Sequence, residues 1–384
     1  MSARRLLARL HGWIGAAVAL FLVLVSLSGA ALAFDAELFR WQYPMLRSAD
    51  PNAARAAPPR IDAMWAAARQ GYGRPIEPMG LFMPGSRVEV DTAMFYGLRP
   101  GGAGPEDTVM IVVDPATGEY RGDFILDDAW GHQLIHFHHE LFAGEVAAAF
   151  VAALGVLLAL FALTGLYLWW PRHGRAWRKA RVPHLGGRPL GRWYRIHGWI
   201  GVWTAIPVFL FGLSGTAVSR PDWFGGLLAK LPYEAPAHLA PAFAGACAGT
   251  VTPDHAVATA QRALPGHRLA TLGFPHEGGP YRLTFKDASP LDHVEGDTAA
   301  FVHATCPGVV RIARPAGAGG VLGQLAFSLH AGRSFGPVFG DLFVVIAGLA
   351  SALLAGSGVY VFAARHLTRR RRVRHAAWIA QPAE

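Results

Sequence analysis

Charged side chains are scarce in this 384-residue sequence. They make up 16% of the residues, whereas hydrophobic residues make up 52%; a soluble domain carries roughly 25% charged residues. The scarcity is greatest in four apolar runs that contain no Asp, Glu, Lys or Arg: residues 14–34, 146–170, 196–218 and 342–364. Because a helix needs roughly 20 apolar residues to cross a bilayer, the composition excludes an ordinary soluble protein and a disordered chain. It predicts four membrane-spanning helices.

Cysteine is also rare, since Cys247 and Cys306 are the only two. No Cys-x-x-Cys-His motif occurs, which excludes a covalently attached haem of the c type. Both cysteines fall in a segment that the charge pattern places outside the cytoplasm, where a pair of cysteines usually forms a disulfide. We therefore expect a Cys247–Cys306 disulfide, with two free buried thiols as the alternative.

The basic residues are concentrated beside the spans. Arginines are dense in 171–195 and in 365–384, and three more precede the first span. Because cytoplasmic loops of membrane proteins are rich in Lys and Arg, both termini and the 171–195 loop are predicted to be cytoplasmic. The first span is too long for a cleaved signal peptide, and its entry motif recurs later in the chain. No basic stripe lies on either outer segment, so we expect no nucleic-acid partner.

The two halves of the chain repeat one motif. Arg-Leu-His-Gly-Trp-Ile-Gly at 9–15 recurs at 195–201 with a single change, and a Ser-Gly pair follows both copies at the same spacing. His138 and His330 each precede a glycine by the same number of residues. This self-similarity predicts an integral membrane α-helical protein whose four-helix transmembrane bundle is built from two parallel repeats.

Each outer segment is predicted to be a small α+β domain. Helices are expected at 61–71 and 253–264, the second with Thr252 as its N-cap, and alternating strands at 81–84, 87–96, 108–113, 268–274, 281–287 and 300–305. The predicted order is 1–34 cytoplasmic start and first span, 35–131 first outer domain, 132–170 second span, 171–195 basic loop, 196–218 third span, 219–325 second outer domain, 326–364 fourth span, and 365–384 basic tail.

Four of the 17 histidines recur at the span entrances: His11 and His197 on the inner side, His138 and His330 on the outer side. An ionisable group at membrane depth is costly and is a functional candidate by default. The spans contain neither Cys nor Met, so a haem inside the bundle would take two histidines as axial ligands. Since His11 and His138 begin oppositely running helices, we expect His11 to pair with His197 and His138 with His330. This predicts two non-covalent haem b groups.

Other histidines could replace these ligands or form a separate metal site. His136 or His139 could replace His138 on the outer side, and His132 with His136 could form a separate metal site one helical turn apart. His173 and His366 are possible alternative inner ligands, although they lie among arginines. Arg9 and Arg195 would lie near the inner haem, either as partners of its propionates or as positive-inside anchors.

Several motifs around the spans complete the pattern. They are Leu10-His11-Gly12-Trp13-Ile14-Gly15 with Ser28-Gly29, Phe137-His138-His139-Glu140-Leu141-Phe142-Ala143-Gly144, Gly165-Leu166-Tyr167-Leu168-Trp169-Trp170-Pro171, Ile196-His197-Gly198-Trp199-Ile200-Gly201, and Leu329-His330-Ala331-Gly332. With them the chain resembles the PepSY-associated transmembrane family, and within it the bacterial inner-membrane ferric-siderophore reductases. The outer segments resemble PepSY domains. The Cys306-Pro307-Gly308 turn, expected after the last strand, departs from that pattern.

The resemblance implies an oxidoreductase of the bacterial inner membrane with two periplasmic domains. It implies haem b binding and reduction of a ferric siderophore, or another ferric chelate, in the periplasm during iron uptake. The electron donor would be a cytoplasmic reductant or a quinol, and membrane lipid surrounds the spans. The alternatives are a membrane-anchored PepSY binding or regulatory module and a siderophore or iron transporter, neither with redox activity.

Overall fold

The computed structural model describes residues 2–48, 50–56, 60–85, 90–170, 186–224, 247, 249–276, 278–286, 296, 298–314 and 325–379. The chain forms two compact units. Met1–Ala33, Phe137–Pro221 and Leu329–Glu384 make up the helical unit, while Phe34–His136 and Asp222–Ser328 make up the sheet unit.

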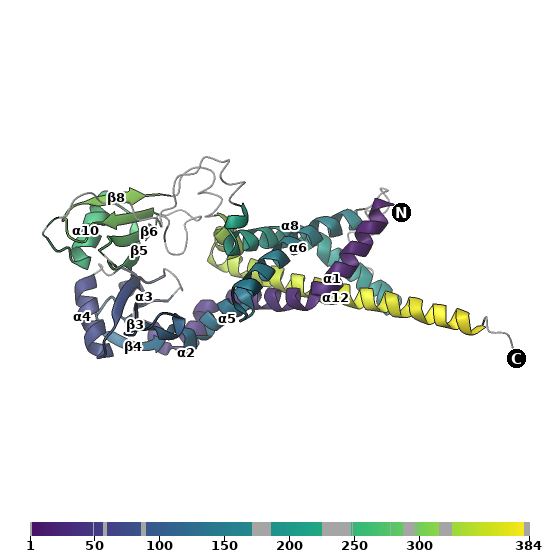
Figure 1. Ribbon diagram of the computed structural model, residues 1–384, viewed down its shortest axis with the longest axis horizontal. Helices are drawn as coiled ribbons and strands as arrows, with labels where there is room; N and C mark the ends of the chain where they lie inside the picture. The colour runs from purple at the N-terminus through teal and green to yellow at the C-terminus, as the bar shows by residue number, and fades with distance from the viewer. Residues whose placement is uncertain are drawn as a thin grey trace. The chain divides into compact units, whose positions relative to one another are not determined.

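Four long helices form the helical unit (Figure 1): α1 (Ala3–Leu32), α6 (Gly144–Trp169), α8 (Pro189–Ser219) and α12 (Pro337–Ile379). Each is long and apolar enough to cross a membrane. The four predicted spans are therefore confirmed as helices of spanning length. Helix α12 also continues through most of the arginine-rich tail, up to Ile379.

Glycines bring these helices into close contact in pairs. A Cβ atom added at Gly212 of α8 would lie 2.5 Å from the carbonyl oxygen of Gly155 in α6. A Cβ atom at Gly348 of α12 would lie 2.7 Å from the carbonyl oxygen of Ser26 in α1. Small residues allow helix backbones to approach each other in this way, so α6 packs against α8 and α1 packs against α12.

The sheet unit contains one open antiparallel sheet of eight strands. Its spatial order is β4-β3-β2-β1-β5-β6-β7-β8. The strands are β1 (Glu77–Phe82), β2 (Ala93–Leu98), β3 (Thr108–Val113), β4 (Tyr120–Ile125), β5 (Arg268–Gly273), β6 (Tyr281–Lys286), β7 (Thr298–Val302) and β8 (Val310–Ala313).

The two outer segments therefore share a sheet, which corrects the expectation of two separate domains. Strands β1 and β5 pair antiparallel, with Leu81 opposite Leu272. A four-stranded half on its own would expose the unpaired backbone of β1 or β5, and pairing the two edges satisfies both. Gly80 permits the approach, because a Cβ atom there would lie 2.7 Å from the carbonyl oxygen of Leu272.

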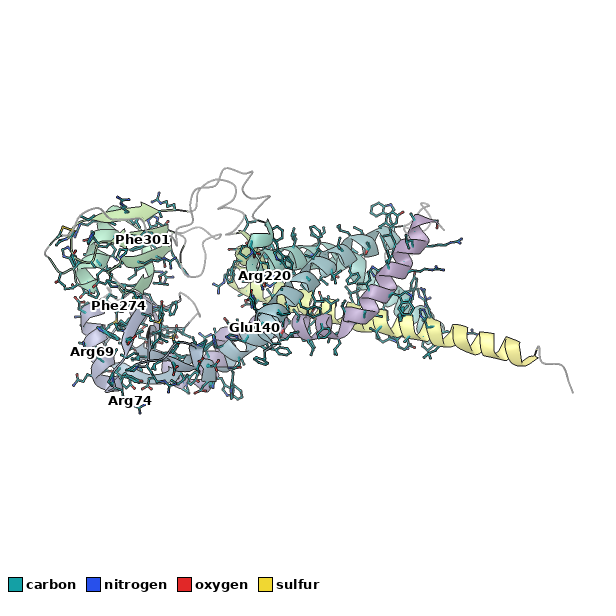
Figure 2. All side chains as sticks on the ribbon, viewed as in Figure 1. Arg69, Arg74, Glu140, Arg220, Phe274 and Phe301 are labelled. Atoms are coloured by element: carbon teal, nitrogen blue, oxygen red, sulfur yellow. A yellow bond between two sulfur atoms is a disulfide. The ribbon has the colours of Figure 1, made fainter. Side chains whose placement is uncertain are left out.

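One hydrophobic core also joins the two halves of the sheet unit. Helices α4 (Ile61–Tyr72) and α10 (Pro253–Ala263) pack on it together. Phe95 of β2 and Phe285 of β6 are both fully buried. Phe274, labelled in Figure 2, directly follows β5, and its ring centroid lies 5.6 Å from that of Trp65 in α4. The oxygen Oγ1 of Thr252 caps α10 by accepting a hydrogen bond from the His255 amide at 3.3 Å.

The remaining elements are short helices that lie between two strands or between the strands and the long helices along the chain. A second core packs on the other face of the first four strands and includes Phe39, Leu46 and Phe82. The elements are α2 (Asp35–Gln42), η1 (Pro44–Leu46), α3 (Pro51–Ala56), η2 (Pro105–Asp107), η3 (Leu126–Asp128), α5 (Trp130–Glu140) and η4 (Arg333–Phe335).

Strand prediction succeeded where side chains are buried and failed at the sheet edges. The strand expected at 108–113 is confirmed without change as β3. Strands β4 and β8 were not predicted, because these edge strands alternate only weakly between buried and exposed residues. The Cys306 turn therefore precedes the last strand rather than following it. Of the expected strand 87–96, residues 93–96 lie in β2 and residues 90–92 are not in a strand, while residues 86–89 lie outside the described residues.

The expected disulfide is present in the sheet unit. Cys247 and Cys306 are joined by a bond of 2.04 Å between their sulfur atoms. Cys306 is buried and Cys247 is exposed. The bond ties the segment before α10 to the turn between β7 and β8.

Gly71 in α4 gives a test of the packing between this helix and the sheet. A Cβ atom at Gly71 would lie 2.2 Å from Cγ of Tyr120 in β4. Gly71→Ala should therefore lower the free energy of unfolding of the sheet unit by about 1–3 kcal/mol, as overpacking does. Chemical denaturation followed by tryptophan fluorescence measures the change.

The same change in a Tyr120→Gly background provides the matched control, because it removes the ring and also Cβ of Tyr120, which would lie 2.7 Å from the added Cβ atom. Without the ring, alanine should be neutral or stabilising, because alanine favours a helix by about 1 kcal/mol over glycine. Equal destabilisation in both backgrounds would contradict the proposed clash.

Candidate functional site

Four histidines meet in two pairs inside the helical unit. The ring centroids of His11 in α1 and His197 in α8 lie 6.4 Å apart. Those of His138, near the end of α5, and His330, which shortly precedes η4, lie 6.1 Å apart. Two imidazoles on opposite sides of one metal, each with a bond of about 2 Å, have centroids roughly 6.5 Å apart. Both pairs have the separation that such coordination requires, and their partners are those expected from the sequence.

A hydroxyl group of a neighbouring helix lies beside Nδ1 of every one of these histidines. The Nδ1–Oγ distances are 2.9 Å for His11 and Thr164, 3.0 Å for His197 and Ser357, 3.0 Å for His138 and Ser28, and 3.4 Å for His330 and Ser214. Helix α6 thus contacts the histidine of α1, and α12 contacts that of α8. The contacts in the second half of the chain match those in the first.

The hydroxyl groups fix the direction of these hydrogen bonds. Each one donates its only proton to a backbone carbonyl of its own helix, as Ser28 does to Val25 at 3.0 Å and Thr164 to Leu160 at 2.7 Å. The pairs Ser214–Leu210 at 2.6 Å and Ser357–Leu354 at 3.2 Å are equivalent. A hydroxyl group has a single donor hydrogen. It therefore accepts a hydrogen bond from histidine, and Nδ1 carries the proton.

The surroundings of His138 also indicate that Nδ1 carries the proton. Its Nδ1 also lies 3.0 Å from the carbonyl oxygen of Val25, and a carbonyl oxygen only accepts. A neutral imidazole with its proton on Nδ1 keeps the lone pair on Nε2. This is the arrangement in which a protein holds a metal-binding histidine, with the second ring nitrogen bonded to an outer partner.

The other candidate histidines are not part of these pairs. Nε2 of His136 lies 3.0 Å from Nε2 of His132, one turn earlier in α5. Nε2 of His139, which is exposed, lies 3.0 Å from Oγ of Ser219. Nδ1 of His366 lies 2.9 Å from the carbonyl oxygen of Phe362. His173 lies outside the described residues. His138 is therefore the residue that meets His330.

The two arginines proposed beside the inner haem differ in their surroundings. Arg9 is exposed on α1. The Arg195 side chain is partly buried and donates a hydrogen bond to the carbonyl oxygen of Gly186. Another arginine, Arg220, is labelled in Figure 2. It forms a salt bridge with Glu145 at 2.6 Å, which ties the end of α8 to the start of α6.

Sequence reasoning recognised only half of the hydroxyl groups. Ser28-Gly29 and Ser214-Gly215 stood out because they follow the repeated histidine motif. Thr164 and Ser357 were missed, although each directly precedes a glycine, as Ser28 and Ser214 do. The shared pattern of a hydroxyl residue followed by glycine could have identified them.

Within the part of the chain that the structure describes, no group of three or more His, Cys, Asp or Glu side chains could hold a metal ion. A haem iron takes its remaining ligands from the porphyrin, so two axial side chains are enough.

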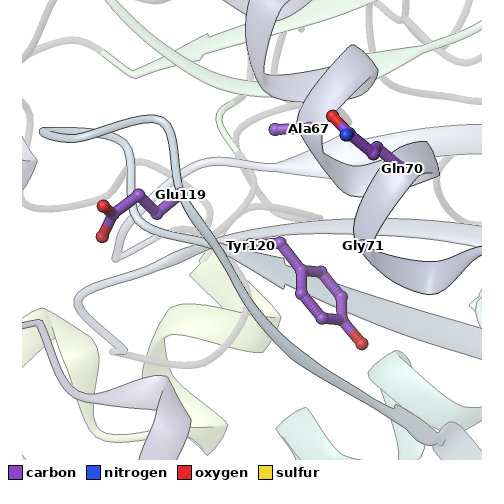
Figure 3. A pocket seen from close by; sticks show the side chains of 5 residues that line it. All are labelled: Ala67, Gln70, Gly71, Glu119 and Tyr120. Atoms are coloured by element: carbon purple, nitrogen blue, oxygen red, sulfur yellow. The ribbon is translucent and has the colours of Figure 1, made fainter.

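The sheet unit has a shallow open depression between α4 and the start of β4. Ala67, Gln70, Gly71, Glu119 and Tyr120 line it (Figure 3). The Tyr120 hydroxyl donates a hydrogen bond to Asp123. Burial and this hydrogen bond raise the pKa of Tyr120 to about 12. The phenol is therefore neutral at physiological pH, and it stabilises the edge strand.

These features define a membrane protein with four spanning helices, two partly buried histidine pairs and an antiparallel sheet. Residues 8–365 match the family described as the PepSY-associated TM region. The chain belongs to this family. No curated protein matches the sequence.

The raised pKa of Tyr120 predicts a pH dependence of the sheet unit. The folded state favours the neutral phenol, so this stabilisation is complete below the unfolded pKa of about 10 and is lost as the pH rises toward about 12. Difference absorbance titration at alkaline pH, wild type minus Tyr120→Phe, should show one phenol ionising near 12. Asp123→Asn, which removes the carboxylate partner, should lower that pKa; an unchanged value would contradict the assignment.

Proposed function

We propose that this protein binds two haem b groups without covalent attachment and conducts electrons across a bacterial inner membrane to a ferric chelate. The proposal rests on two His–His pairs whose ring centroids have the separation expected for two ligands of one metal. In these pairs Nδ1 of the histidine already donates a hydrogen bond to a hydroxyl group. His11 and His197 would hold one haem, and His138 and His330 the other.

The donor set fits such a group. Two neutral imidazoles meet in an apolar bundle, and haem is commonly held by axial histidine. Ser334, a few residues after His330, buries an Oγ atom that has no hydrogen-bond partner in the described structure. A buried polar atom of this kind normally has a partner, and a polar edge of a bound ring would supply one.

Bound haem would supply one-electron redox chemistry, since its iron alternates between the ferric and ferrous states. The chain's own residues would hold the haem groups and orient the imidazole rings that bind them. The hydroxyl groups would hold each ring by accepting a hydrogen bond from Nδ1, while the apolar spans exclude water and so disfavour a charged imidazole. Along α1, about 25 Å of helix rise separates His11 from Ser28, the contact of His138. The two proposed sites would thus divide the width of the membrane between them.

The reaction needs one electron for each iron. A cytoplasmic reductant or a quinol would give up the electron, and Fe(III) in the chelate would accept it and become Fe(II), with no covalent bond formed to the protein. Iron is then released, because oxygen-rich siderophores hold the softer ferrous ion less tightly. No acid or base catalyst is required.

The placement of the chain in the cell is part of the proposal. Arginine-rich segments beside α1, α8 and α12 favour cytoplasmic termini. The sheet unit would then be periplasmic, would correspond to two PepSY-like halves, and would meet the ferric siderophore. Arg9 and Arg195 would lie on the side of the inner haem, where a guanidinium suits a propionate.

The family match favours one rival function, a membrane-anchored PepSY module that binds or regulates a partner without redox activity. A transporter is disfavoured, because the predicted spans contain no carboxylate for ion coupling. The rival functions predict a colourless protein.

Haem content separates these functions. Full-length protein expressed with ample iron and purified in detergent should be red, should contain two haems per chain, and should change its visible spectrum on adding dithionite. His138→Ala and His330→Ala should each retain one haem, because each removes a ligand of the same site. The pyridine haemochrome assay gives the ratio of haem to protein.

His139→Ala is the matched control, since this neighbour of His138 contacts Ser219 instead of His330. It should retain both haems. A colourless wild type would contradict the function, and two haems in His330→Ala would contradict the ligand assignment.

A further inference from the structure

We propose that the four Ser/Thr-Gly pairs beside the histidines are positioning residues. In each pair the hydroxyl group sets the donor strength of the imidazole, and the glycine sets how tightly its ring is held. The pairs are Thr164-Gly165 at His11, Ser357-Gly358 at His197, Ser28-Gly29 at His138 and Ser214-Gly215 at His330. This inference rests on the proposed function, and it assigns different properties to the two haem sites.

The two sites differ in how much room there is between each glycine and the imidazole ring beside it. A Cβ atom at Gly29 would lie 2.7 Å from Cε1 of His138, and one at Gly215 would lie 2.6 Å from Cε1 of His330. Carbon atoms do not approach so closely, so a methyl group at either position must displace the ring. Because Cε1 lies between the two ring nitrogens, the displacement also moves Nε2 out of its coordinating position.

The glycines of the other site leave more room. A Cβ atom at Gly165 would lie 3.5 Å from Cε1 of His11, and one at Gly358 would lie 3.3 Å from Cε1 of His197. The first distance is an ordinary van der Waals contact. A methyl group at Gly165 is accommodated, and the His11–His197 site should therefore tolerate it.

The hydroxyl groups distinguish the histidines by their hydrogen bonds. In the described part of the chain, Nδ1 of His11 has one acceptor, Thr164 Oγ1 at 2.9 Å. Nδ1 of His138 has two, Ser28 Oγ and the Val25 carbonyl oxygen, each at 3.0 Å. Loss of the Ser28 hydroxyl leaves an acceptor in place, whereas loss of the Thr164 hydroxyl leaves a buried N–H without one.

An acceptor at Nδ1 makes the imidazole a stronger donor at Nε2. A stronger donor favours the more highly charged ferric iron and lowers the midpoint potential. Removing the acceptor should have the opposite effect. The potential is thus a readout that a merely structural role of Thr164 would not move.

The electronic arm of the test uses Thr164→Val, which keeps the branched shape and removes the hydroxyl. Redox titration of the holoprotein in detergent, followed in the visible spectrum, should show one of the two midpoint potentials moving to a more positive value. Thr164→Ser keeps the hydroxyl group and should keep the wild-type midpoint potential. Ser28→Ala should shift the potential of the other haem less, because the Val25 carbonyl oxygen remains.

The steric arm compares Gly29→Ala with Gly165→Ala. Both glycines lie within long helices, where alanine is the better helix former, so weakened helices do not explain a loss of haem. Gly29→Ala should lose one of the two haems, and Gly165→Ala should keep both. Gly215→Ala should behave as Gly29→Ala does. Haem-to-protein ratio and size-exclusion chromatography measure the result.

The outcomes separate the two proposals. A wild type without haem overturns the proposed function. A wild type with two haems whose potentials do not change in Thr164→Val overturns the role of the hydroxyl, and equal haem content in Gly29→Ala and Gly165→Ala overturns the role of the glycines. Either result leaves the proposed function standing. If Gly29→Ala does not fold, the nearly isosteric Thr164→Val still decides the electronic arm.

Discussion

The hydrogen bond between a buried imidazole N–H and a hydroxyl group is the interaction on which the helical unit depends. In an apolar bundle a histidine with an unsatisfied N–H costs free energy, and a charged histidine costs more. The hydroxyl group removes the first cost by accepting a hydrogen bond from the N–H, because its own proton is donated to a carbonyl of its helix. The same bond fixes the orientation of the imidazole ring within the bundle.

This contact also connects the two close helix pairs. Helix α1 packs on α12 and α6 packs on α8, with glycines at each contact. The histidine contacts run between those pairs, from His11 of α1 to Thr164 of α6 and from His197 of α8 to Ser357 of α12. A ligand held between His11 and His197 would bridge the same two helix pairs.

The sequence predicted the histidine pairs because a helix is periodic and the repeated motif makes the two halves equivalent. The spacing to the following glycine favoured His138, with His136 and His139 left as alternatives. Residues His136 and His138 are about 200° apart around a helix, so only one of them faces His330, and the packing of α5 determines which. The hydroxyl groups of Thr164 and Ser357 were overlooked because a lone Ser or Thr in a span carries no signal until its neighbour is known.

The sequence by itself determined the four spans, the family, the candidate ligands and most interior strands, because hydropathy and short motifs are properties of neighbouring residues. The tertiary structure decided that the two outer segments form one sheet, through pairing of Leu81 with Leu272, and that β4 and β8 complete its edges. It also decided which hydroxyl group meets which histidine. These contacts join residues far apart in the chain, and their free energy depends on backbone edges and ring orientations that local composition does not encode.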